Sequence, residues 1–184
     1  MAVHLMRIIA GLAKGRRLLT PRAGTRPMMG RAREGLFSSL GERVSGARVL
    51  DLYAGSGSLG LEALSRGAAS VVFVERGRAA LAVLRVNVAA VGLGGEVVRA
   101  EVDAYLSGAA GPYDLVFVDP PYALPLASVE STLARLPGLL AVGGNVVLHR
   151  RAGEGLGRLP GLMVIDRRRY GDTEITRLVK EGAP

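Results

Sequence analysis

The chain has no cysteine and no tryptophan, and only two histidines, His4 and His149, among its 184 residues. The absence of cysteine excludes disulfide bonds, thiolate zinc sites and cysteine nucleophiles. The two histidines stand far apart in the sequence and form no metal-ligand motif. We therefore expect no metal site.

Long hydrophobic runs are also absent. No apolar stretch reaches the roughly 20 residues of a membrane-spanning helix, and the N-terminus lacks the regions of a secretory signal. Because 49% of the residues are hydrophobic, the chain can still bury one core. We expect a compact cytoplasmic protein with no membrane partner, and a monomer by default.

The formal net charge of +8 is concentrated at the start of the chain. Ten basic and two acidic residues precede Asp51, whereas residues 51–184 contain fourteen of each. Such asymmetry is typical of a segment that contacts a polyanion, although a solvated basic arm has the same composition. The prediction is a basic, polyanion-binding extension at residues 1–46, followed by a second domain at residues 47–184.

Short apolar runs alternate with helical stretches from residue 49 onward. The expected strands are Val49–Tyr53, Val71–Glu75, Val97–Ala100, Leu115–Val118, Asn145–His149, Leu162–Asp166 and Glu174–Val179. The expected helices between the first five are Leu59–Arg66, Arg78–Val91, Ala104–Ser107 and Ala127–Arg135. This alternation predicts an α/β fold with a doubly wound, mostly parallel sheet of seven strands.

The two ends of the chain depart from this alternation. Only the turn-like segment Arg167–Thr173 separates the last two strands, which predicts an antiparallel hairpin at the edge of the sheet. Near the N-terminus, Arg7–Gly11 and Lys14–Leu19 predict a small basic hairpin, and Arg31–Leu40 predicts a helix.

A glycine-rich loop follows the first expected strand. The segment Asp51–Gly60 runs from a buried strand into a helix, the context in which a G-x-G-x-x-G pattern indicates a cofactor site. No Gly-Lys-Ser/Thr follows, which argues against a phosphate-binding P-loop. Glu75 ends the next strand 20 residues after Gly55, where an acidic side chain typically binds ribose hydroxyls. An adenosine-containing cofactor is expected, either S-adenosylmethionine or a dinucleotide, although a structural turn would also contain glycines.

Further residues are candidates for the same cofactor site. Asp51 would bind the amino group of a methionine moiety, which a dinucleotide lacks, or else brace the loop. Asp103 would bind an adenine amino group or cap a helix. The complete expected cofactor set is Asp51, Tyr53, Ala54, Gly55, Ser56, Gly57, Glu75, Arg76, Asp103, Ala104 and Asp119.

The expected catalytic segment is Asp119-Pro120-Pro121-Tyr122, which directly follows the fourth expected strand beside the topological switch point. Consecutive prolines fix the backbone, so carbonyl groups point in set directions. An exocyclic amino nitrogen on a base is a weak nucleophile because its lone pair is delocalised. We expect the Asp119 carboxylate and the Pro120 carbonyl to accept its two hydrogens while Tyr122 stacks on the base. The alternative is a structural Pro-Pro turn.

At these residues the sequence resembles the Rossmann-fold methyltransferases that act on amino groups, whose motif is Asp/Asn-Pro-Pro-Tyr/Phe. Within them it is similar to the bacterial 16S rRNA guanine-N2 methyltransferase family. The similarity extends over Met6–Gly11, Lys14–Arg16, Arg26–Pro27, Arg31–Phe37, Asp51–Ser65, Phe117–Tyr122 and Tyr170–Thr173. Where that family reads Arg-Pro-Thr-x-Asp-Arg, this chain has Met28 and Gly30 in place of the threonine and the aspartate, so the roles of those two residues do not carry over.

The resemblance implies methyl transfer from S-adenosylmethionine to a guanine N2 in a small-subunit rRNA loop near the peptidyl site, on an assembled or assembling ribosomal subunit. It also implies that basic residues neutralise rRNA phosphates. The implied RNA-binding residues are Arg7, Lys14, Arg16, Arg17, Arg26, Arg31 and Arg33.

Other functions remain open from the residues alone. A DNA adenine-N6 or protein glutamine-N5 methyltransferase would use a related motif, although the basic extension argues against a protein substrate. An RNA-binding ribosome assembly factor could keep the fold without turnover, but the Asp119–Tyr122 segment is intact. A nicotinamide dehydrogenase would share the glycine loop and Glu75 and would leave the Pro-Pro segment unexplained.

Overall fold

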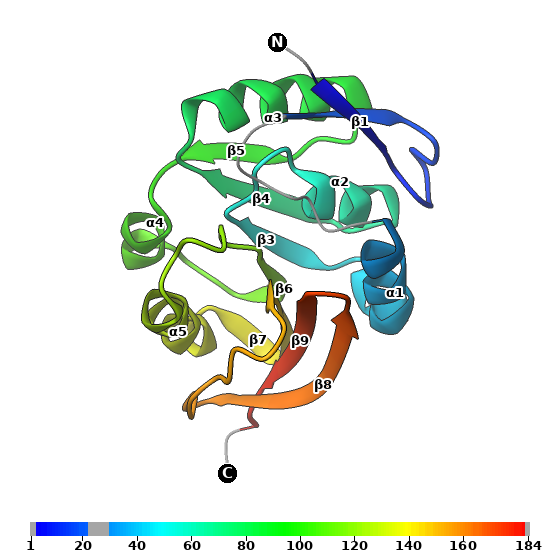
Figure 1. Ribbon diagram of the computed structural model, residues 1–184. Coiled ribbons are helices and arrows are strands. Elements are labelled where there is room, and N and C mark those ends of the chain that lie inside the picture. The colour runs from blue at the N-terminus through cyan, green and yellow to red at the C-terminus, as the bar shows by residue number, and fades with distance from the viewer. Residues whose placement is uncertain (1–2, 22–29, 183–184) are drawn as a thin grey trace.

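The computed structural model describes residues 3–21 and 30–182 and contains two sheets (Figure 1). The large sheet has seven strands in the order β5-β4-β3-β6-β7-β9-β8, and β1 and β2 form a separate two-stranded ribbon. Strands β5, β4, β3, β6 and β7 are parallel, and β9 pairs antiparallel with both β7 and β8. The expected doubly wound, mostly parallel sheet with an N-terminal hairpin and helix is confirmed.

The strands of the large sheet form where the apolar runs predict them. Their bounds are β3 (Arg48–Leu52), β4 (Ser70–Glu75), β5 (Glu96–Arg99), β6 (Tyr113–Val118), β7 (Leu140–Arg151), β8 (Leu162–Tyr170) and β9 (Thr173–Lys180). In the central strand β6, every residue except Asp114 is buried, as expected of a strand covered on both faces.

Helices cover both faces of the sheet (Figure 1). Their bounds are α1 (Gly30–Leu40), α2 (Ser58–Ser65), α3 (Arg78–Val91), α4 (Val102–Gly108) and α5 (Leu126–Arg135), with single 3-10 turns at Gly41–Val44 and Leu136–Gly138. Helices α1 to α3 pack on one face around Phe37, Phe73 and Phe117. Helices α4 and α5 pack on the other face around Val116 and Leu133. None of the helices in the described residues is long and apolar enough to cross a membrane.

The C-terminal hairpin lies at the sheet edge as expected, but its turn is shorter than the sequence indicates. Residues Arg167–Tyr170 continue β8 and pair with β9 up to Thr173. Only Gly171, with φ of +61°, and Asp172 form the turn. The expectation of a turn across Arg167–Thr173 is therefore wrong, because ladder pairing overrides the polar composition of the segment.

The N-terminal hairpin is also shifted. Its strands are β1 (Val3–Arg7) and β2 (Arg17–Pro21), so that residues 8–16 form the connection. The buried Glu62 carboxylate of α2 explains the shift, because it accepts the backbone N–H groups of Ile9 at 2.8 Å and Ala10 at 3.1 Å. These bonds hold the chain against α2 instead of against β2.

The N-terminal residues share the core of the sheet domain. Ile8 and Leu18 belong to the same buried cluster as Phe73 of β4. The Asn87 side chain of α3 pairs with both the N–H and the C=O of Leu19, each at 2.9 Å. The N-terminal hairpin is thus held in a fixed place beside α2 and α3.

Candidate active site

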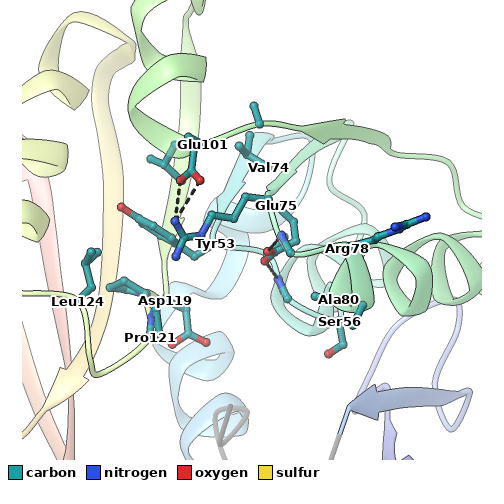
Figure 2. A pocket seen from close by; sticks show the side chains of 18 of the residues that line it. Tyr53, Ser56, Val74, Glu75, Arg78, Ala80, Glu101, Asp119, Pro121 and Leu124 are labelled. Carbon is teal, nitrogen blue, oxygen red and sulfur yellow. Dashed lines mark hydrogen bonds and ion pairs between the residues drawn. The ribbon is translucent and has the colours of Figure 1, made fainter. Parts of the chain in front are cut away.

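A cavity of about 620 Å³ opens where β3, β4 and β6 end (Figure 2). The carboxyl ends of adjacent parallel strands are the usual place for ligands in such sheets. Among the residues that line the cavity are Tyr53, Ala54, Gly55, Ser56, Val74, Glu75, Arg76, Ala100, Glu101, Val102, Asp103, Asp119, Pro120, Pro121 and Tyr122. The glycine loop and the Asp-Pro-Pro-Tyr segment therefore meet at one site.

The glycine loop leaves β3 through a series of left-handed backbone conformations. Tyr53 has φ of +58° and Gly57 has φ of +81°. The φ of Gly57 disfavours residues with a side chain, and a Cβ atom there would lie 2.4 Å from Leu84 Cδ1 of α3. Asn87 also donates to the Ser56 carbonyl at 2.9 Å. These contacts fix the floor of the cavity.

Glu75 connects the glycine loop to the end of β4 (Figure 2). Its Oε2 accepts the N–H of Gly55 at 2.9 Å, and its Oε1 accepts the N–H of Gly77 at 2.6 Å. Since a carboxylate has about four acceptor sites, these two bonds leave acceptors for a ribose diol in the cavity.

Asp51 lies behind the loop and not in the cavity lining. It is 2% exposed, and its Oδ2 accepts the N–H of Gly60 at 2.9 Å. Burial raises the pKa of Asp51 well above its ordinary value, the Gly60 N–H opposes this rise, and the charges of Asp119 and Glu75 add to it. The expected contact of Asp51 with a methionine amino group is not supported; the side chain braces the loop.

Two other expected cofactor residues also lie outside the cavity lining, Gly57 and Ala104. Gly57 faces Leu84, and Ala104 lies exposed on α4 beside Asp103. The expected residues that do line the cavity are Tyr53, Ala54, Gly55, Ser56, Glu75, Arg76, Asp103 and Asp119.

Glu101, which the sequence did not single out, lines the cavity beside the expected residues Tyr53 and Arg76. Arg76 donates to Glu101 at 3.0 and 3.1 Å across the cavity edge (Figure 2). The Tyr53 hydroxyl lies 3.1 Å from the Thr132 hydroxyl of α5, and burial raises its pKa while that hydrogen bond lowers it. Glu101 lies two residues after the end of the short strand β5 and directly before α4, a position at the sheet edge that could have drawn attention to it.

The Asp-Pro-Pro-Tyr segment is held by the neighbouring strand β7. Asp119 Oδ1 lies 2.8 Å from Nδ1 of His149, and the Asp119 side chain keeps 25% of its surface exposed. Arg150 donates to the carbonyls of Pro121 at 3.0 Å and Leu124 at 3.1 Å. Sequence reasoning missed both contacts, because only the pairing of Val118 with Leu148 brings these segments together.

Most of the basic residues expected to bind RNA lie at the surface. Arg7, Lys14, Arg16, Arg17 and Arg31 are exposed, and Arg16 also donates to the Ala90 carbonyl. Arg26 lies outside the described residues.

Arg33 is the exception among the described residues of the expected RNA-binding set. It is 2% exposed, it donates to Met6 Sδ and to the Arg7 carbonyl, and burial lowers its pKa. A guanidinium enclosed in this way cannot reach a phosphate, so the expectation for Arg33 is wrong: it connects α1 to the end of β1. Among residues 3–21 and 30–182, no three side chains of histidine, aspartate or glutamate gather in a way that could hold a metal ion.

This fold and this site define a class, the Rossmann-like methyltransferases. The chain belongs to the family described as conserved hypothetical protein 95, whose model matches residues 6–179. It is 35% identical over 180 residues to ribosomal RNA small subunit methyltransferase D of Escherichia coli, covering 97% of this chain and 91% of that protein.

Solved structures agree with this assignment. One from Escherichia coli is 35% identical with a TM-score of 0.87 and coverage of 97% of this chain and 99% of that one. Another, a hypothetical protein of Thermus thermophilus, is 36% identical with a TM-score of 0.84 and coverage of 96% and 99%.

Proposed function

We propose that this protein transfers a methyl group from S-adenosylmethionine to the exocyclic N2 amino group of a guanine in 16S rRNA. One observation carries the proposal: the Asp119–Tyr122 segment and the glycine loop with Glu75 line the same cavity. The Escherichia coli relative, named for small-subunit rRNA, supports the choice of substrate.

The residues present suit this cofactor. A cavity of about 620 Å³ is within the range of small-molecule sites. Val74, Ala100 and Val102 form an apolar part of its lining that suits an adenine ring, and Glu75 offers acceptors for the ribose. The cofactor supplies an activated methyl group on a sulfonium centre, so the chain needs no nucleophile of its own.

The chain's contribution is alignment and charge. We propose that the Asp119 carboxylate and the Pro120 carbonyl accept the two amino hydrogens of the guanine, which localises the nitrogen lone pair. Tyr122 would stack on the base, and the carboxylate can take the proton that the nitrogen loses after methylation. Both Asp119 and Tyr122 line the cavity, as this arrangement requires.

We propose residues 1–46 as the RNA-binding extension of a methyltransferase domain at residues 47–184. Arg7, Lys14, Arg17 and Arg31 are exposed cations that can neutralise rRNA phosphates. The proposed substrate is an assembled or assembling small subunit in the cytoplasm. The target guanine is proposed to lie in an rRNA loop, since a base in a loop costs less to extrude than one in a duplex. The protein would act as a monomer and without a metal.

The test is radiolabelled methyl transfer from S-adenosylmethionine to four substrates: small subunits that lack the modification, naked rRNA, transfer RNA and duplex DNA. The labelled nucleoside is then identified. N2-methylguanosine in 16S rRNA is the expected product. N6-methyladenine in DNA, or no transfer to any substrate despite cofactor binding, would contradict the proposal.

A further inference from the structure

Three consecutive residues at the end of β7 each contact a different part of the Asp119–Tyr122 segment. His149 pairs with the Asp119 carboxylate at 2.8 Å. Arg150 donates to the Pro121 carbonyl at 3.0 Å while its Nε binds Glu154 at 2.7 Å. The Arg151 guanidinium lies 5.4 Å from the centre of the Tyr122 ring. Strand β7 thus serves as the support on which this segment rests.

We propose, building on the function proposed above, that His149 is a positioning residue for Asp119. A carboxylate only accepts hydrogen bonds, so the 2.8 Å contact requires a hydrogen on Nδ1 of His149. In the described residues no hydrogen bond to Asp119 Oδ2 is present. His149 therefore fixes the carboxylate through Oδ1 and leaves Oδ2 for the amino group of the base.

The surroundings of His149 favour this role over simple packing. The residue is 3% exposed and cannot exchange its partner for water. Its neighbour Leu148 pairs with Val118, so the register of β6 and β7 holds the imidazole beside Asp119. The Tyr122 ring packs edge-on against the imidazole, with 6.1 Å between the ring centroids, which further restricts the imidazole's orientation. These contacts hold the imidazole in place beside Asp119.

Two substitutions separate the hydrogen bond from the packing. His149→Phe keeps a ring in the buried space and removes the donor, whereas His149→Asn loses the ring and keeps an N–H close to the Nδ1 position. We expect the single-turnover rate of methyl transfer to fall about 10- to 100-fold in His149→Phe with the Kd for S-adenosylmethionine unchanged. We expect His149→Asn to recover part of that rate although its Tm is lower. The proposal would be overturned if the variant with the lower Tm were also the slower one, because the rate would then depend on stability and not on the hydrogen-bond donor.

A second readout does not depend on methyl transfer. The two histidines of the chain make imidazole nitrogen resonances simple to assign by NMR, with a His4→Gln variant to identify His149. We expect Nδ1 of His149 to carry a hydrogen and its signal to shift in Asp119→Ala. A neutral His149 protonated only on Nε2 would overturn the proposal. If the wild-type protein methylates no RNA, the proposed function fails, and the NMR result still decides whether the bond exists.

Discussion

The Glu75 carboxylate accepts the backbone N–H of Gly55, 20 residues earlier in the chain, at 2.9 Å. The same carboxylate accepts the N–H of Gly77 at 2.6 Å. One side chain thus holds the glycine loop at the end of β3 to the end of β4 and still faces the cavity. The acid that is expected to bind a ribose therefore also sets the shape of the site.

Replacing Glu75 tests this double role. We expect Glu75→Ala to raise the Kd for S-adenosylmethionine about 10- to 100-fold, because hydrogen bonds to a charged group contribute roughly 1.5–3 kcal/mol. The Kd of Glu75→Gln should lie between those of the wild type and Glu75→Ala, since its amide keeps one acceptor oxygen. Isothermal titration calorimetry measures the affinity, with Glu96→Gln, exposed at the start of β5, as the matched control. An unchanged Kd in Glu75→Ala would contradict the assignment.

The close approach of α2 to β4 predicts a stability effect. A Cβ atom at Gly60 would lie 2.3 Å from Phe73 Cε1 and 2.8 Å from Val71 Cγ1. We expect Gly60→Ala to lower the free energy of unfolding by about 1–3 kcal/mol through overpacking. Urea unfolding measures it. Gly108→Ala is the control, because a Cβ atom there meets nothing within 4 Å, and an equal loss in both variants would be inconsistent with the steric explanation.

Buried Asp51 predicts a dependence of stability on pH. Burial raises its folded-state pKa above the ordinary value of 3.8. The folded state therefore favours the uncharged acid. The wild-type protein becomes less stable as pH rises through the folded-state pKa, because the buried side chain must then ionise. Asp51→Asn stays uncharged and keeps an acceptor for Gly60. The free energy of unfolding of the variant minus that of the wild type should increase as pH rises above the ordinary pKa of 3.8 and should level off above the folded-state pKa. A difference that is constant or falls with pH would count against a raised pKa.

The exposed cations of the N-terminal extension predict a change in salt dependence. The triple variant Lys14→Gln, Arg17→Gln and Arg31→Gln should bind 16S rRNA more weakly, with a slope of log K against log salt that is smaller by about 2–3. Its affinity for S-adenosylmethionine should not change. Arg158→Gln, exposed in the loop before β8, serves as a control for charge alone. A slope equal to that of the wild type would show that these residues do not contact phosphates.

The sequence predicted the parts of the fold that depend on local patterns. The apolar runs locate the strands of the large sheet, and the helix predicted at Arg78–Val91 has those bounds in the structure. The spacing of Gly55 and Glu75 predicted that both belong to one cofactor site, and in the structure both line the same cavity and are in direct contact. Such features follow from periodicity and from strand-loop-helix order, which are readable without knowledge of long-range pairing.

The remaining features depend on strand register and on burial. Asp119 and His149 stand 30 positions apart and meet only because β6 pairs with β7. Arg33 looked like one more cation of a basic arm, yet it lies three residues before Leu36 and four before Phe37, on the buried face of α1. Helical spacing was the signal that could have removed it from the RNA-binding set.

The most direct test of the account is the Asp119→Ala variant, examined by calorimetry for cofactor binding and by radiolabelled transfer to small subunits. We expect methyl transfer to fall about 100-fold or more, because preorganised acceptors at the reacting group contribute on that scale, while the Kd for S-adenosylmethionine stays close to that of the wild type. Asp114→Ala, near the start of β6 and outside the cavity, should leave both unchanged. Equal loss of binding and transfer in Asp119→Ala, or full transfer without the carboxylate, would contradict a catalytic role for Asp119.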